Sequence, residues 1–285
     1  MSEIKLIECP RDALQGYPIF IDTNKKIDYL NSLLKIGFHT LDCGSFVSKK
    51  MVPQMSDTSE VLKAIDLEGI KTKILVIVAN ERGAIEASKY DNIDYFGYPF
   101  SVSENFQIRN TNKTIHESLH VLLKIIEIAN KSNKEVITYL SMGFGNPYGD
   151  PWSVEIILEC IYKFKLLGIK TISLSDTIGV SKNDQIGKLF KSLNKDFKEI
   201  EFGAHFHALP DEWFNKINSA YLSGCRRFDG AIMGWGGCPM ASNLLIGNIP
   251  TEKLISYFNS LGEDLYLNFI AFESAYNNFK SLIHV

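Results

Sequence analysis

The chain has 285 residues, of which 45% are hydrophobic and 22% are charged, so it is long enough to bury one large core or two modest ones. Its net charge of −3 and its isoelectric point near 6.1 provide no basic surface for a nucleic acid or for an anionic membrane. The composition therefore excludes binding to either partner by overall charge, and a local site must attract any anionic substrate.

Short runs of apolar and β-branched residues recur along the chain and predict eight strands. They cover residues 4–9, 39–44, 73–79, 93–97, 135–141, 171–176, 201–207 and 227–233. Segments with helical spacing lie between them, among them 27–36, 118–130, 154–167 and 213–222. Several of these segments end at a glycine of the kind that follows a helix C-terminus: Gly37, Gly168 and Gly224. This alternation is typical of parallel β/α architecture.

We predict an α/β fold, a (β/α)8 (TIM) barrel that forms a single domain over residues 1–285, with the segment after about residue 250 packing on the barrel. A doubly wound open sheet normally carries a glycine-rich turn after its first strand, where this chain has Pro-Arg-Asp-Ala. Polar residues follow the strands at the end where barrel active sites are built: Arg11, Asp12, Asp42, Asn80, Ser141, Asp176, His207, Cys238 and Asn248.

Two local patterns indicate chemistry. Residues i and i+2 of a strand project from the same face, so His205 and His207 can ligate one ion, and the Arg11–Asp12 pair would complete that site. Cys238 follows Gly236 and Gly237, which places a thiol on a glycine-hinged loop. An isolated His-x-His is more often a pair of rim histidines, and a lone cysteine is more often a small buried residue.

The five cysteines are odd in number and show no Cys-x-x-Cys spacing, which favours a reduced, cytoplasmic protein with buried thiols. The N-terminus lacks the features of a signal or transit peptide, and no apolar run approaches transmembrane length. We therefore expect no membrane partner and no nucleic-acid partner. A homodimer is an option that the sequence leaves open.

The chain resembles the metal-dependent acyl-CoA lyases and condensing enzymes with a pyruvate carboxyltransferase-like barrel, and within them the 3-hydroxy-3-methylglutaryl-CoA lyase (HMG-CoA lyase) family. Arg-Asp with His-x-His is shared with isopropylmalate and homocitrate synthases and with hydroxy-oxovalerate aldolases. The segments 45–48, 52–55 and 236–239 are similar to the lyase branch. In the family's order, the matching segments begin with Glu8-Cys9-Pro10-Arg11-Asp12-Ala13-Leu14-Gln15, Ser45-Phe46-Val47-Ser48 and Val52-Pro53-Gln54-Met55, and continue with Ser173-Leu174-Ser175-Asp176-Thr177-Ile178-Gly179-Val180, His205-Phe206-His207 and Gly236-Gly237-Cys238-Pro239.

The resemblance implies a metal-dependent retro-Claisen cleavage of HMG-CoA to acetyl-CoA and acetoacetate, with CoA as part of the substrate. It implies one divalent cation, Mg²⁺ or Mn²⁺, held by Asp12, His205, His207 and Asn248. Two imidazoles, a carboxylate and an amide oxygen leave two octahedral positions for substrate oxygens. Such an ion would lower the pKa of the substrate hydroxyl.

The resemblance also implies the catalytic residues. Arg11 would stabilise the enolate, Cys238 would donate a proton to it, and His205 and Asp42 would also serve catalysis. For Asp176, a catalytic role and a cap of the following helix are equally open. The acyl group would be bound by residues at inward or rim positions: Arg11, Gln15, Ser45, Tyr139, Ser141, Ser173 and Thr177. Lys49 and Lys50 would hold CoA or form a solvated basic pair.

The chain also departs from the family's pattern. Ala13 would strain its loop if that position required a positive φ, and the stretch from Cys238 to Asn248 is one residue longer. These changes leave two alternatives: a lyase or aldolase for another β-hydroxy acyl-CoA or a 2-oxo acid, and a barrel that binds metal or CoA without turnover. The substituted positions are Ala13 for Gly, Asp42 for Glu, Ile137 for Arg, Asn146 for Cys and Ala208 for Asp.

Overall fold

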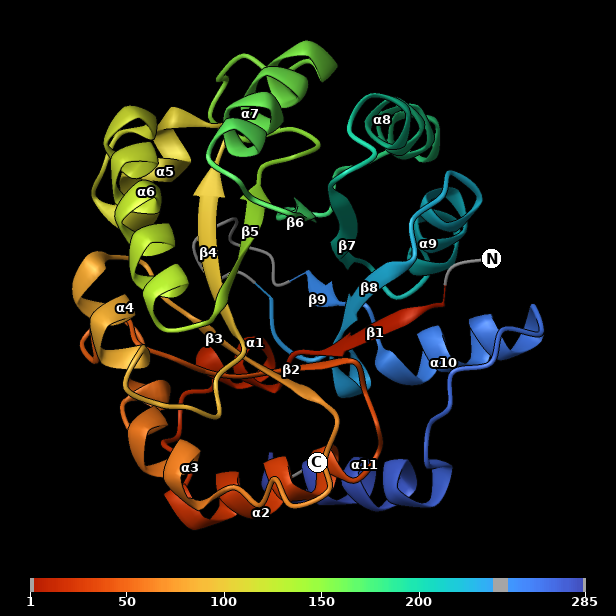
Figure 1. Ribbon diagram of the computed structural model, residues 1–285. Helices are drawn as coiled ribbons and strands as arrows, with labels where there is room; N and C mark the ends of the chain where they lie inside the picture. Colours follow the sequence, from red (N-terminus) through yellow and green to blue (C-terminus); the bar gives the residue numbers. More distant parts are fainter. Residues whose placement is uncertain (1–2, 238–245, 284–285) are drawn as a thin grey trace.

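The computed structural model describes residues 3–237 and 246–283, in which eight parallel strands close into a barrel (Figure 1). The strand order is β6-β5-β4-β3-β2-β1-β8-β7, and a further pairing of β6 with β7 closes the ring. The predicted barrel is confirmed. The strands are β1 (Lys5–Glu8), β2 (Thr40–Ser45), β3 (Lys73–Ile77), β4 (Tyr95–Ser101), β5 (Glu135–Ser141), β6 (Thr171–Asp176), β7 (Glu201–Ala208) and β8 (Arg227–Gly230), with a short β9 (Gly247–Asn248) on β7.

Helices surround the barrel (Figure 1), and most of them bury one apolar face against it. They are α1 (Pro10–Gln15), α2 (Thr23–Leu34), α3 (Thr58–Ala64), α4 (Glu81–Ala87), α5 (Glu104–Thr111), α6 (Ile115–Lys131), α7 (Val154–Leu166), α8 (Asn183–Asp196), α9 (Trp213–Leu222), α10 (Thr251–Ser260) and α11 (Phe269–Leu282), with single turns η1 (Pro53–Met55) and η2 (Ile232–Gly234). Helix α6 starts before the predicted residue 118, because Thr114 and Glu117 form a capping box.

Strand β4 differs most from its prediction of residues 93–97. It runs to Ser101 and pairs with β5 along its whole length, from Tyr95 opposite Glu135 to Ser101 opposite Ser141. Gly97 and Pro99 are residues that strand interiors usually avoid, so the sequence pattern ends too early. Gly97 has a packing role, because a side chain there would lie 2.6 Å from Ile77 Cδ1.

The two C-terminal helices pack on the outside of the barrel. The ring of Phe258 in α10 lies 4.9 Å from that of Phe228 in β8. In α11, the ring of Phe279 lies 5.3 Å from that of Tyr29 in α2. Both contacts are buried, so these helices extend the main hydrophobic core.

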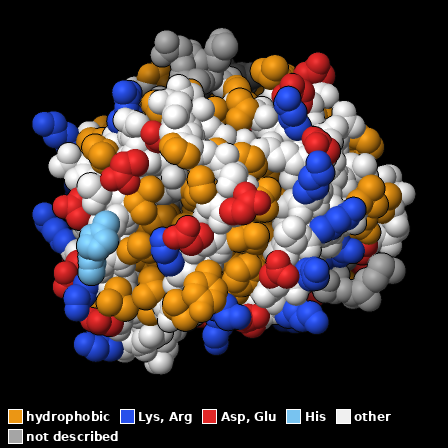
Figure 2. Space-filling model, turned by 90° about the horizontal axis from the view of Figure 1, so that it is seen from above, with side chains coloured by type: hydrophobic (Ala, Val, Ile, Leu, Met, Phe, Trp, Pro, Cys, Tyr) orange, Lys and Arg blue, Asp and Glu red, His pale blue; other side chains and the backbone are white. Residues whose placement is uncertain are grey.

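Among the described residues, no helix is long and apolar enough to span a bilayer. On the face drawn in Figure 2, cationic and anionic side chains are interspersed with hydrophobic ones.

Candidate active site

Polar side chains from α1, β7 and β9 meet at the carboxyl end of the barrel. Strand β9 is antiparallel to β7 and places Asn248 opposite His207. The Asn248 amide nitrogen donates to Asp12 Oδ2 at 2.8 Å. One ligand atom from each of Asp12, His205 and His207 lies within 4.8 Å of the others. The fold thus brings together the four residues that the sequence predicts as metal ligands.

His207 is poised to bind a cation. Its Nδ1 lies 3.0 Å from the backbone oxygen of Thr177, which can only accept, so Nδ1 carries the hydrogen. Its buried Nε2 has no hydrogen-bond partner in the described part of the chain and lies 3.9 Å from Asp12 Oδ2. Burial lowers the pKa of His207, and nearby His205 lowers it further. A neutral imidazole with a free lone pair is the form that a metal requires.

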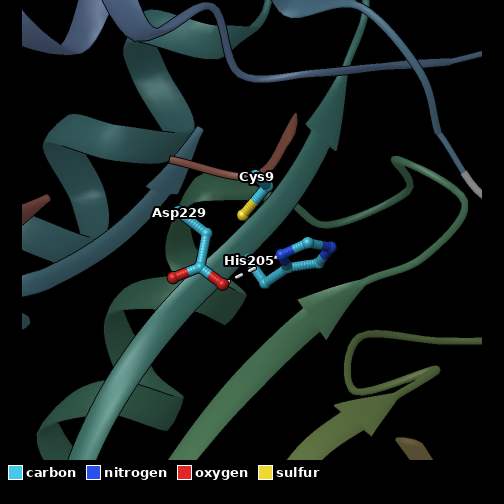
Figure 3. A group of neighbouring side chains, drawn as sticks. All are labelled: Cys9, His205 and Asp229. Carbon is cyan, nitrogen blue, oxygen red and sulfur yellow. Dashed lines mark hydrogen bonds and ion pairs between the residues drawn. The ribbon is translucent and has the colours of Figure 1, made fainter. Parts of the chain in front are cut away.

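His205 has a different partner. Its Nδ1 lies 3.0 Å from Oδ2 of Asp229, a buried carboxylate on β8 (Figure 3). Burial lowers the pKa of His205, but the hydrogen bond and charge of Asp229 outweigh this effect and the pKa is raised. On another side, the Tyr139 ring meets the imidazole edge-on at 5.4 Å. The ring is therefore fixed in orientation.

Asp12 remains ionised in this cluster. Burial raises its pKa, but Arg11, His205 and His207 outweigh burial and lower the pKa to about 2. Asp12 Oδ1 accepts from Arg11 Nη1 at 3.0 Å and from Gln15 Nε2 at 2.8 Å. The site offers two imidazoles and a buried carboxylate, and the Nε2 of His207 is free to bind. This donor set fits a divalent cation.

Arg11 is held from below by Asp42. The guanidinium donates to Asp42 Oδ2 from Nε at 3.0 Å and from Nη2 at 2.5 Å. Burial raises the pKa of Asp42 to about 6 although Arg11 opposes the shift, so this carboxyl is ionised at neutral pH. Asp42 is fully buried and does not line the cavity described below. Its contact with the site runs through Arg11.

Helix α1 presents Arg11 and Asp12 to the site. Pro10 occupies its first turn, where the missing N–H is not needed. Ala13 is buried within the same helix and has no positive φ. The change from glycine at this position therefore causes no backbone strain.

Two glycines shape the loop that follows η2, and the first of them, Gly236, lies against α1. Gly236 has a φ of +87°, and a side chain there would lie 2.6 Å from the backbone oxygen of Asp12. Gly237 has a φ of +135°. Only glycine adopts both conformations at so close an approach. The predicted acid, Cys238, lies outside the described residues.

A cavity of about 350 Å³ opens above Arg11, Asp12 and the two histidines. Five of the other predicted substrate-binding residues line it: Gln15, Ser45, Tyr139, Ser141 and Thr177. Ser173 does not line it, because it is fully buried one step deeper on β6 and donates to Asp229. Ser175, two residues nearer the carboxyl end of the strand, takes the place at the cavity wall.

Asp176 is bound to the chain that follows β6. It accepts from the backbone of Val180 and Ser181 and forms an ion pair of 2.7 Å with Lys216. Asp176 does not line the cavity. These contacts favour a structural role in the turn before α8, and they correspond to neither of the two roles predicted for it.

Sequence reasoning missed the wall formed by the end of α5 and the following turn. Asn110, Thr111 and Lys113 line the cavity, whereas Lys49 and Lys50 are exposed and do not. The capping box at Thr114 could have located this turn, because it fixes the start of α6. Asp229 was also missed, although its alternation with Arg227 on β8 marks it as inward-facing.

Comparisons with known proteins agree with this geometry. The HMGL-like family matches residues 4–278. The chain belongs to this family. A member from Bacillus subtilis, hydroxymethylglutaryl-CoA lyase YngG, is 34% identical over 86% of this chain and 81% of its own length. The cytoplasmic 3-hydroxy-3-methylglutaryl-CoA lyase of Homo sapiens is 31% identical over 93% of this chain and 71% of its own.

A solved structure gives the same family. It is an HMG-CoA lyase from Acinetobacter baumannii in complex with coenzyme A and 3-methylmalate. It is 27% identical to this chain, covers 99% of it and 92% of its own length, and superposes with a TM-score of 0.91. The family's barrel and this one therefore share the same overall fold.

Proposed function

We propose that this protein cleaves HMG-CoA to acetyl-CoA and acetoacetate with one divalent cation. The observation that carries the proposal is the convergence of Asp12, His205 and His207 beside Arg11 on the floor of one cavity. Membership of the HMGL-like family supports it, as do the two relatives named as lyases of this substrate. The relative from A. baumannii, solved with coenzyme A, supports an acyl-CoA as the partner.

Asp12, His205 and His207 would hold the cation. Asn248 would be a fourth donor through its amide oxygen once the amide turns, because its nitrogen now donates to Asp12 Oδ2. This set of oxygen and nitrogen ligands suits Mg²⁺ or Mn²⁺. When bound, the cation supplies Lewis-acid chemistry that lowers the pKa of the substrate hydroxyl. The orphaned Nε2 of His207 supports this assignment, because a buried polar atom without a partner is costly.

Arg11 would act on the charge that forms as the carbon–carbon bond breaks. After the hydroxyl has lost its proton to a base, the electron pair of its oxygen forms the C=O bond of the ketone as the carbon–carbon bond breaks, and the pair of the broken bond moves toward the thioester oxygen. A cation fixed at that oxygen stabilises the transition state more than the ground state. Asp42 holds the guanidinium in place through two hydrogen bonds, so its role is to position Arg11.

The enolate carbon must then receive a proton. We assign this step to Cys238, which follows Gly237 and Gly236, and Gly236 lies against Asp12 and Ala13. Five side chains at the cavity wall would bind the acyl group: Gln15, Ser45, Tyr139, Ser141 and Thr177. Lys113 on the same wall would bind the phosphates of CoA through its charge. Lys49 and Lys50 would do the same from the rim, since they follow another wall residue, Ser48.

The test is a cleavage assay on metal-depleted protein. HMG-CoA is added with and without Mg²⁺ or Mn²⁺, and acetoacetate is measured. We expect cleavage only with metal, and loss of cleavage in a Cys238→Ala variant. Cys160→Ala, which removes a buried thiol far from the site in sequence, is the matched control and should retain activity. Metal binding without cleavage of HMG-CoA would indicate another β-hydroxy acyl-CoA, a 2-oxo acid or a barrel without turnover.

We also propose a cytoplasmic location, supported by the human relative named as cytoplasmic and by four buried free cysteines. Reporter fusions or cell fractionation would test it. The homodimer left open by the sequence is tested by the mass of the purified protein in solution.

A further inference from the structure

The two histidines of the site are oriented by partners of different chemistry. His207 Nδ1 lies 3.0 Å from a backbone oxygen, which is neutral and fixed by the main chain. His205 Nδ1 lies 3.0 Å from a side-chain carboxylate, that of Asp229. No substitution removes the first partner, but a single substitution removes the second. The function of Asp229 can therefore be tested directly.

Asp229 lies in the barrel interior, beneath the cavity. It is 2% exposed, does not line the cavity, and pairs in register with Ile7 of β1. It therefore has no route to touch the substrate. Ser173 Oγ donates to the same oxygen, Oδ2, at 3.3 Å, which fixes the carboxylate from below.

Cys9 packs beside this pair. Figure 3 shows its sulfur pointing toward His205 and Asp229, and the thiol is fully buried. The sulfur lies within 4.8 Å of the nearest ligand atoms of both residues. Burial raises the pKa of Cys9 well above its ordinary value, so the thiol is neutral. Its sulfur donates to the backbone oxygen of Ile7 at 4.0 Å, so it does not replace Asp229 as the partner of the imidazole.

Asp42, another inward-facing carboxylate of this region, is already engaged. Asp42 accepts two hydrogen bonds from Arg11, so it is not the partner of His205. Asp229 is thus the acceptor that decides which nitrogen of His205 carries the hydrogen. With the hydrogen on Nδ1, the lone pair is on Nε2, which points away from Asp229 (Figure 3).

We propose that Asp229 is a positioning residue for the metal site: it holds His205 as the tautomer that offers Nε2 to the divalent cation and strengthens that nitrogen as a donor. Carboxylates behind metal-bound imidazoles act in this way in other proteins. The inference rests on the metal site of the proposed function, but not on the identity of the substrate.

The experiment measures Mn²⁺ affinity without substrate, by electron paramagnetic resonance of free Mn²⁺. Asp229→Ala removes the acceptor, and we expect affinity to fall about 10- to 100-fold. Asp229→Asn keeps a neutral oxygen that accepts from Nδ1–H, so we expect a smaller loss. The graded order of wild type, Asn variant and Ala variant is a result that loss of packing alone would not produce.

The matched control is Asp57→Asn. Asp57 is a buried carboxylate bonded to Lys26 at 2.9 Å, outside the ligand cluster. We expect this variant to lower thermal stability while Mn²⁺ affinity stays at the wild-type value. Circular dichroism of every variant verifies that the barrel is folded.

A second measurement keeps the inference testable if the Ala variant does not fold. In the wild-type protein labelled with ¹⁵N-histidine, the NMR spectrum reports which nitrogen of His205 carries the hydrogen. A neutral His205 with its hydrogen on Nδ1, or an imidazolium that loses the Nε2 hydrogen first as the pH rises, supports the inference; a neutral His205 with its hydrogen on Nε2 alone in the metal-free protein overturns it.

Three other outcomes are decisive. Wild-type affinity for Mn²⁺ in Asp229→Ala overturns the inference, even if the protein cleaves HMG-CoA. A wild-type protein that binds no Mn²⁺ overturns it as well. Graded Mn²⁺ binding without cleavage of HMG-CoA supports the inference and contradicts the proposed function.

Discussion

The two halves of the barrel interior are built from opposite kinds of residue. Strands β3 and β5 contribute a buried apolar cluster of Leu75, Ile77, Ile137 and Tyr139. Strands β1, β7 and β8 contribute ionised or hydrogen-bonded groups that lie within a few ångströms of one another, such as the His205–Asp229 pair. Packing stabilises the first half, whereas the second depends on hydrogen bonds and ion pairs between its buried polar groups. Apolar side chains therefore fill one side of the barrel interior, and the polar groups of the candidate active site occupy the other.

The largest effect is expected from a ligand in the polar half. His207→Ala removes the imidazole whose Nε2 faces Asp12, so we expect cleavage to fall about 1,000-fold, which equals about 4 kcal/mol. The rate of acetoacetate formation at saturating Mn²⁺ gives this value. His120→Ala on the outer surface of α6 is the control and should keep full activity. Equal losses in both variants would contradict the assignment.

The next effect belongs to the apolar half. Ile137→Ala leaves a void among Leu75, Ile77 and Tyr139, and we expect the free energy of unfolding to fall by about 3 kcal/mol. Urea denaturation measures this change. Mn²⁺ affinity should stay unchanged, because Ile137 contacts no predicted ligand within the described cluster. A loss of Mn²⁺ affinity alongside the loss of stability would show that metal binding depends on the apolar half, which contradicts this prediction.

Substitution of Arg11 measures how much its charge contributes to catalysis and how much it contributes to stability. In Arg11→Met the side chain keeps its bulk but loses its charge, so we expect kcat to fall about 100-fold with a smaller change in KM. The substitution also leaves Asp42 without its partner, and we expect some loss of thermal stability. Asp42→Asn separates the two effects, since it keeps the charge of Arg11. A kcat unchanged in Arg11→Met would rule out its proposed role.

The last effect depends on pH and concerns Glu8, at the end of β1. Glu8 accepts from Ile232 N at 2.9 Å and from Thr251 Oγ1 at 2.5 Å. Burial raises its pKa from 4.5 to about 8, so between these values the unfolded chain releases a proton that the folded chain keeps. Stability from Glu8 is therefore full below pH 4.5 and is lost as the pH rises toward 8, by about 1 kcal/mol per pH unit.

Glu8→Gln removes this titration: the amide oxygen can still accept from Ile232 N, and the amide nitrogen can donate to Thr251 Oγ1. We expect the free energy of unfolding of the wild type to fall more steeply than that of the variant between pH 5 and pH 8. Denaturation curves across this range measure the difference. Parallel slopes would show that Glu8 is ionised in the folded protein.

Local patterns predicted much of the site. The His-x-His alternation placed His205 and His207 on one face because a strand has a period of two. The pair Gly236–Gly237 marked the loop against α1 because only glycine adopts those φ angles. Ser173 was predicted at the cavity wall but lies deeper, because the alternation of residues along a strand gives the face on which a side chain lies and not its depth in the barrel.

The sequence by itself determined the period of each element and hence the barrel, because neighbouring residues set those periods. Tertiary structure alone decided that Asn248 lies 2.8 Å from Asp12, 236 residues away, and that Asp229 stands behind His205. Such contacts depend on strand register and on the path of loops, to which every strand of the closed sheet contributes. No local stretch of sequence contains that information.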